Sequence, residues 1–155
     1  MNYETLEIDF IERTLAVIAQ YEQCELKSDK YEVTLFVNCL TGLLLLPKEK
    51  GLLHYLPNEN ITFLTSLGID ILHIKYTEIK TIKDLATQLR HCLAHFDIKF
   101  TDNGTYKIQN IVFEDNQEKK GVIAEFTLLE IKILVKCLAV NMIENYKKYS
   151  PKFKK

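Results

Sequence analysis

The sequence predicts a mainly α-helical fold, an up-and-down bundle of four to five helices with a small β-hairpin before the last helix. Four long segments repeat apolar residues at helical spacing, two segments open with a capping-box sequence, and one stretch holds two β-rich runs joined by a polar turn. The 155 residues suffice for one domain. We expect that domain over residues 1–149, with the hairpin inserted at about 98–126 and a basic tail at 150–155.

The first two helices are predicted from residues 6–21 and 31–46. The first is amphipathic, and the second, YEVTLFVNCLTGLLLL, is apolar almost all round before Pro47 stops it. Its apolar run is shorter than the roughly 20 residues that a membrane-spanning helix needs. We therefore expect a buried helix and no membrane partner.

The third principal helix is predicted from TIKDLATQLRHCLAHF, residues 81–96. Thr81 and Asp84 have the spacing of a capping box. At about 100° per residue, one third of the helix circumference is apolar and forms the expected core stripe, which consists of Leu85, Leu89, Cys92, Leu93 and Phe96. The preceding residues 47–80 contain two prolines and two glycines, a pattern that favours loops with short helical turns.

The hairpin is predicted from YKIQNIVF (106–113) and GVIAEF (121–126), and Asn103-Gly104 is a turn signal. The final helix follows a second capping box, Thr127 to Glu130, and is expected to reach about Tyr149. Its core stripe is Ile131, Leu134, Val135, Leu138 and Met142.

Composition alone names no partner, because 20 basic and 21 acidic residues leave a formal charge of −1. A local patch can still bind nucleic acid, and Lys147 and Lys148 open a basic cluster that continues into the tail. The four cysteines are scattered, and we expect them to be reduced. The N-terminus lacks the features of a secretory signal, so the expected location is the cytoplasm.

Arg90, His91 and His95 stand near the end of the third helix. The two histidines are four positions apart and so lie about 40° apart around the helix, near the azimuth of Asp84, whereas Arg90 lies roughly 140° from His95. The two imidazoles are therefore expected to share one place, which the long arginine side chain flanks.

Three interpretations of these residues are open. A polar helix face collects arginine and histidine by chance. Histidines four residues apart suit zinc, but a zinc site needs three or four ligands, and only Asp84 or Asp97 is close in sequence. RNA cleavage needs a base, an acid and a cation that holds phosphate, and two imidazoles and a guanidinium supply all three without a metal.

The segment RHCLAH resembles the motif of HEPN (higher eukaryotes and prokaryotes nucleotide-binding) domains, which is an arginine, a polar residue, and a histidine a few residues later. Its place near the end of a helix agrees with that family, and YEVTLFVNCLTGLLLLPKE is similar to the second helix of a prokaryotic branch. The resemblance extends from Asp9 to about Phe96, and the closing helix fits it loosely.

The resemblance implies a metal-independent endoribonuclease, a toxin or phage-defence protein without a cofactor, acting on RNA rather than DNA. It also implies a homodimer in which two motifs line one cleft, and an antitoxin protein as a further partner. Arg90 would hold the phosphate, His95 would be the main acid/base group, and His91 would orient it or transfer a second proton. The alternative is a catalytically inactive HEPN-like module that binds RNA, nucleotide or protein.

Other residues are assigned supporting roles. Asn38 is the one strongly polar residue within the second helix, and we expect a buried amide that either bonds across the bundle or dimer or supports the His95 cleft. Asp84 is the acidic neighbour of the histidines by azimuth, and Lys147 and Lys148 are candidates for contacting RNA. Asp97 stands where some HEPN toxins carry a tyrosine that a nucleotidyltransferase modifies, so that form of regulation is not expected.

Overall fold

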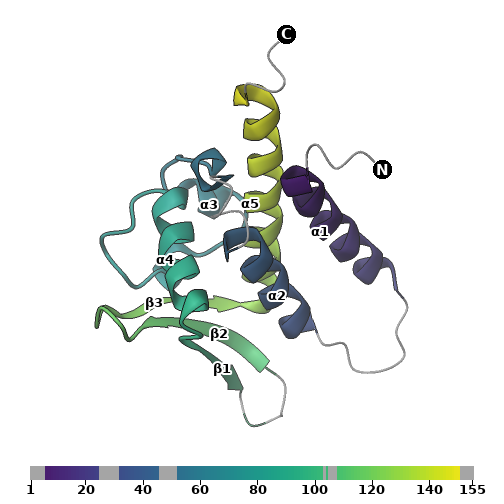
Figure 1. The fold of residues 1–155 in the computed structure, drawn as a ribbon. Coiled ribbons are helices and arrows are strands. Elements are labelled where there is room, and N and C mark those ends of the chain that lie inside the picture. The colour runs from purple at the N-terminus through teal and green to yellow at the C-terminus, as the bar shows by residue number, and fades with distance from the viewer. Residues whose placement is uncertain (1–5, 25–31, 46–51, 103, 105–107, 151–155) are drawn as a thin grey trace. The chain divides into compact units, whose positions relative to one another are not determined.

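The structure of the chain is a computed structural model, and it describes residues 6–24, 32–45, 52–102, 104 and 108–150 (Figure 1). The chain divides into two compact units. Unit 1 consists of Met1–Leu56 and Val135–Lys155, and unit 2 of Pro57–Leu134. The single domain over residues 1–149 stays a prediction.

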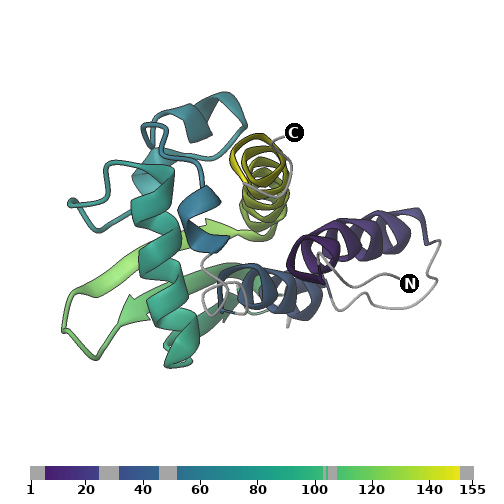
Figure 2. The same cartoon turned by 45° about the horizontal axis from the view of Figure 1, so that its top comes forward.

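Unit 1 is helical, and its helices have nearly the predicted bounds. They are α1 (Leu6–Gln23), α2 (Glu32–Leu45), the 3-10 helix η2 (Leu52–Tyr55) and most of α5 (Leu128–Tyr149). Figure 2 shows α1 and α2 side by side. At Gly42 a Cβ atom would come within 3.0 Å of the Phe10 ring, so the glycine allows these two helices to approach closely.

Most of the apolar residues of α2 are buried. Phe36, Leu40, Leu43 and Leu44 are fully buried, as are Ile11 and Ile18 of α1. None of the helices in the described ranges combines the length and apolarity that crossing a bilayer requires. The predicted interior helix is therefore confirmed.

Unit 2 contains a three-stranded sheet where the sequence predicted a hairpin. The strands β1 (Ile98–Asp102), β2 (Ile108–Asp115) and β3 (Gly121–Thr127) pair antiparallel in the order β1-β2-β3. The two predicted runs became β2 and β3. The hairpin prediction was incomplete, because the turn signal at Asn103-Gly104 marks a first hairpin between β1 and β2. Gly104 has a φ of +83°, which favours glycine, while Asn103 lies outside the described residues.

The helix α4 (Ile82–Ala94) lies over one face of this sheet (Figure 1). Four of its predicted stripe residues are buried, namely Leu85, Leu89, Cys92 and Leu93. Opposite them, Ile111, Phe113 and Phe126 of the sheet are fully buried. Between residues 57 and 80 the unit holds only the short α3 (Phe63–Ser66) and the 3-10 helix η3 (Ile71–His73), as predicted for that stretch.

Phe96 is a correction to the predicted core stripe, since 77% of it is exposed. The helix ends at Ala94, and Phe96 then takes a left-handed conformation with φ +55°. The Asp97 N–H donates to the Cys92 carbonyl (2.8 Å) and the Phe96 N–H to the Leu93 carbonyl (3.1 Å). This is a Schellman helix end, a motif that usually has glycine at the left-handed position. The turn carries the phenylalanine out of the helical stripe.

Both predicted capping boxes are confirmed. The Thr81 hydroxyl accepts the Asp84 N–H (3.1 Å), and the Asp84 carboxylate accepts the Thr81 N–H (2.8 Å). At the start of α5, Thr127 and Glu130 exchange the same two hydrogen bonds, at 3.2 and 2.9 Å. These bonds satisfy N–H groups that a helix start leaves without partners, so the sequence fixes where α4 and α5 begin.

Candidate functional site at the end of helix α4

The two predicted histidines meet at the end of α4. The centroids of the His91 and His95 rings are 4.7 Å apart, and the ring planes cross at 62°. His91 is in the last turn, and His95 is the C-terminal cap, whose N–H donates to the His91 carbonyl at 3.2 Å. Helical spacing alone thus brings these imidazoles together, and the exposed His95 faces solvent.

Arg90 precedes this pair on α4 and is partly exposed. Its Nε atom is buried without a hydrogen-bond partner in the described part of the chain. No ion pair joins its guanidinium to a described carboxylate. Its helical position alone points the guanidinium away from His95.

A buried carboxylate that sequence analysis missed lies against His91. Asp115, the last residue of β2, has 0% of its side chain exposed, and its Oδ1 lies 3.8 Å from His91 Nε2. The same Oδ1 accepts the Glu118 N–H at 2.8 Å. Its Oδ2 lies 3.5 Å from Lys120 Nζ. The turn between β2 and β3 therefore holds both oxygens of the carboxylate in place.

Asp115 is held in its ionised form. Burial by itself would raise its pKa, but the Glu118 N–H bond and the positive charges of His91 and Lys120 outweigh burial, and the net pKa is lowered. A carboxylate is a hydrogen-bond acceptor only. It therefore favours a proton on the His91 nitrogen that faces it.

A second carboxylate, Asp97, follows His95 in the chain. Its Oδ1 accepts the Asn116 side-chain N–H at 3.1 Å, and its carbonyl accepts the Glu114 N–H at 3.0 Å, so it is tied to the end of β2. The Asn116 hydrogen bond is the main cause that lowers the pKa of Asp97, and the charge of His95 lowers it further. Each imidazole thus has a carboxylate beside it.

Buried polar atoms without hydrogen-bond partners gather here. Within the described residues they include Arg90 Nε, His91 Nε2, Asp97 Oδ2 and Asp115 Oδ2. Folded proteins pair nearly all such atoms, because leaving one unpaired costs about 1–3 kcal/mol. Their presence at one helix end marks this place as a candidate functional site.

Lys120 is less available to a ligand than Arg90. Its ammonium group pairs with Glu118, donates to Gln88 Oε1 at 3.2 Å and lies 5.6 Å from the Tyr76 ring centroid. The hydrogen bond to Glu118 is the main cause that raises its pKa. Lys120 therefore serves to balance the buried Asp115 charge.

Cys92 lies on the same turn of α4 but is not suited to act as a nucleophile. It is fully buried, and burial, followed by the charges of Asp115 and Asp97, raises its pKa to about 12. The thiol therefore stays protonated at neutral pH. None of the four cysteines, all of which lie in the described ranges, forms a disulfide, and Cys39, Cys92 and Cys137 are buried.

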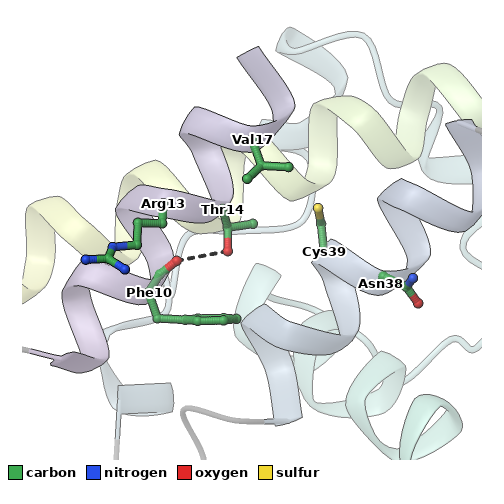
Figure 3. Close-up of a pocket in the computed structure, with 6 residues that line it drawn as sticks. All are labelled: Phe10, Arg13, Thr14, Val17, Asn38 and Cys39. Carbon is green, nitrogen blue, oxygen red and sulfur yellow. Dashed lines mark hydrogen bonds between the residues drawn. The ribbon is translucent and has the colours of Figure 1, made fainter. Parts of the chain in front are cut away.

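Asp84 and Asn38 are placed differently from the sequence interpretation. Asp84 caps the start of α4, about 16 Å along the helix axis from His95, and its carboxylate is occupied by the N–H groups of Thr81 and Lys80. Asn38 is exposed rather than buried. It belongs to unit 1, where a pocket of about 310 Å³ (Figure 3) is lined by Phe10, Arg13, Thr14, Val17, Asn38 and Cys39. A role for Asn38 beside His95 stays a prediction.

The candidate RNA-binding lysines lie on α5 in unit 1. Lys147 Nζ forms an ion pair with Glu12 at 2.9 Å, and Lys148 Nζ lies 5.0 Å from the Tyr149 ring centroid. Lys152, Lys154 and Lys155 of the expected tail lie outside the described residues. Lys147 thus stabilises the contact of α5 with α1, and an RNA contact for either lysine stays a prediction.

For the zinc alternative, the described residues contain no cluster of three histidine, cysteine, aspartate or glutamate side chains that could hold a metal ion. His91 has Asp115 as its neighbour, and His95 has Asp97. Zinc sites in proteins use three or four ligands around one point. The end of α4 instead shows an ion-pair contact of His91 with Asp115 and a ring contact of His91 with His95.

The comparison with protein families agrees with the mainly helical fold. The model of the family HEPN pEK499 p136 matches residues 1–150. The chain therefore belongs to this family of HEPN domains, a class whose members are commonly ribonucleases or toxins and commonly dimerise. No curated protein and no solved structure gave a significant match.

Proposed function

We propose that the protein is a metal-independent endoribonuclease with Arg90, His91 and His95 in its active site. The observation that carries the proposal is the contact between the His91 and His95 rings, 4.7 Å apart at their centroids, beside two ionised carboxylates. HEPN membership supports the reaction class.

The reaction requires two proton transfers around one phosphate. The ribose 2′-oxygen attacks the adjacent phosphorus as its proton passes to a base, and the bond from phosphorus to the 5′-oxygen breaks as an acid protonates that oxygen. The products are a 2′,3′-cyclic phosphate and a 5′-hydroxyl. His95 is exposed and takes one of these roles, while His91 orients it or transfers the second proton. The Arg90 guanidinium stabilises the charge that develops on the phosphate oxygens.

We also propose that the active site forms in a homodimer through α4, with α2 as a further contact. Arg90 lies roughly 140° around the helix from His95, so one copy alone aims the guanidinium away from the exposed imidazole. Two antiparallel copies of α4 would set Arg90 of one subunit against His95 of the other. Mass measurement in solution tests this directly, and a strict monomer at working concentrations would contradict it.

The biological setting that fits such an enzyme is a toxin or a phage-defence protein, held in check by an antitoxin protein. Uncontrolled RNA cleavage would harm the cell that makes it, so a neutralising partner is expected. Asp97 in place of a tyrosine argues against control by nucleotide transfer to that position.

The decisive experiment is RNA cleavage by purified protein in excess EDTA. The wild type is compared with Arg90→Ala and His95→Ala, and with His54→Ala as a control that removes an exposed histidine of unit 1. Cleavage by the wild type and the control alone supports the proposal. RNA binding without cleavage by all four proteins would indicate the inactive binding module instead.

A further inference from the structure

We infer that Asp115 is a positioning residue, whose buried carboxylate keeps a proton on His91 Nε2 and holds that ring against His95. The inference rests on the proposed function, because positioning His91 affects a reaction only if RNA is cleaved. It adds a residue from β2, distant in sequence from the RHCLAH motif, to the machinery of the site.

The Asp115 carboxylate faces His91 Nε2. That atom is buried and has no hydrogen-bond partner in the described part of the chain, and Asp115 Oδ1 lies 3.8 Å from it. A bare ring nitrogen would set its lone pair against the oxygen of an ionised carboxylate, whereas an N–H group would point its proton there. The geometry therefore favours the proton on Nε2.

The Asp115 carboxylate is itself held in place by its neighbours. Its side chain is fully buried, the Glu118 N–H donates to Oδ1 at 2.8 Å, and the Lys120 ammonium lies 3.5 Å from Oδ2. Lys120 is in turn held by Glu118 and Gln88. A carboxylate held at both oxygens in this way can orient the ring beside it.

His91 Nε2 and Asp115 Oδ1 lie close together but are not hydrogen-bonded. At 3.8 Å the two atoms are within ion-pair range but beyond the length of a good hydrogen bond. Hydrogen bonds of catalytic groups are often long before substrate binds and tighten in the reacting complex. A small rotation of His91 toward β2 would complete this bond while its ring remains next to His95.

A spectroscopic test needs no variant of Asp115. The nitrogen-15 chemical shifts of the His91 ring, assigned by their loss in His91→Gln, report which nitrogen carries the proton. In the wild type at neutral pH the proton is expected on Nε2. A ring with a bare Nε2 and its proton on Nδ1 would overturn the inference, whether or not the protein cleaves RNA.

The kinetic test compares Asp115→Asn with Glu114→Gln, which removes a carboxylate from the neighbouring position of β2, where it pairs with Lys99. If Asp115 prepares His91 for proton transfer, kcat of Asp115→Asn falls by about 10- to 100-fold while KM changes by less than about two-fold. Glu114→Gln is expected to keep the wild-type kcat. An unchanged kcat in Asp115→Asn would overturn the inference and leave the proposed nuclease intact.

A double variant separates positioning from a general structural effect. If Asp115 acts through His91, adding Asp115→Asn to His91→Ala lowers kcat no further. A further loss of the same size in that background would show that Asp115 acts by another route and would overturn the inference. A wild-type protein that cleaves no RNA removes the proposed function and, with it, any role for Asp115 in proton transfer.

Discussion

Unit 2 contains two pairs of histidine and carboxylate that are built differently. At the start of α5, His73 Nδ1 lies 2.9 Å from both oxygens of Glu130, which also accepts two backbone N–H groups and a hydroxyl. At the end of α4, His91 Nε2 remains 3.8 Å from Asp115 and makes no hydrogen bond to the described residues. The first pair is saturated with hydrogen bonds, and the second is not.

The difference separates a structural histidine from a candidate functional one. The Glu130 carboxylate joins η3 to the capping box of α5, and each of its bonds stabilises the fold. The pair at α4 leaves buried donor and acceptor atoms without hydrogen bonds to the described residues, beside the exposed His95. A buried histidine–carboxylate pair with unused hydrogen-bonding atoms is therefore a more specific sign of a candidate site than a histidine near an acid alone.

The largest expected difference is in catalysis, between His95, whose ring contacts the His91 ring of the α4 pair, and His73 of the α5 pair. His95→Ala is predicted to lower kcat for RNA cleavage by at least about 100-fold, because it removes a proton-transfer group. His73→Ala is predicted to keep the wild-type kcat, since His73 bonds only to Glu130 among the residues that the structure describes. Steady-state cleavage assays on both variants test this, and an equal loss in the two would remove the distinction.

The next largest difference is in stability. Glu130→Ala is predicted to lower the free energy of unfolding by about 3 kcal/mol, because it leaves two N–H groups and His73 without their buried partner. Asp115→Asn is predicted to lower it by about 1 kcal/mol or less, since an amide oxygen can still accept the Glu118 N–H. Urea unfolding at neutral pH measures both. A larger loss in Asp115→Asn would mean that the α4 pair is structural.

Acid is expected to weaken both pairs. For Glu130, burial alone would raise the pKa, but hydrogen bonds from Thr127, Asp70 and His73 outweigh it, and the pKa is lowered in the folded state. The stabilisation is therefore complete above the pKa of the unfolded chain, about 4.3, and is lost as the pH falls through the lower folded value. Unfolding measured from pH 7 to pH 3 should show a smaller acid-induced loss for Glu130→Gln than for the wild type. Equal pH dependence would contradict the lowered pKa.

The smallest predicted effect concerns Phe96, beside the unsaturated pair. Phe96→Gly is expected to raise the free energy of unfolding by roughly 0.5–1 kcal/mol, because glycine adopts the left-handed C-terminal position of a Schellman end without strain. Thermal unfolding measures the change, and Gly104→Ala, at φ +83°, is a control expected to destabilise. A loss of stability in Phe96→Gly would show that the ring makes stabilising contacts.

Much of the fold was predictable because its signals are local. Helical spacing gave the four long helices, and the pairs Thr81–Asp84 and Thr127–Glu130 gave the starts of two of them. β1 was missed because its five residues carry only two apolar positions, Ile98 and Phe100, and it is defined by pairing with β2. Phe96 was misplaced because the helical repeat was extended past the residue where the helix ends.

The sequence by itself determined the helices, the HEPN motif and the contact of His91 with His95, because residues four apart on a helix are neighbours whatever the rest of the chain does. Only the tertiary structure decided that Asp115 lies against His91 and that Asp97 is tied to β2. Those contacts depend on the packing of α4 over the sheet, which joins residues separated by about twenty positions, and no local pattern encodes such a distance.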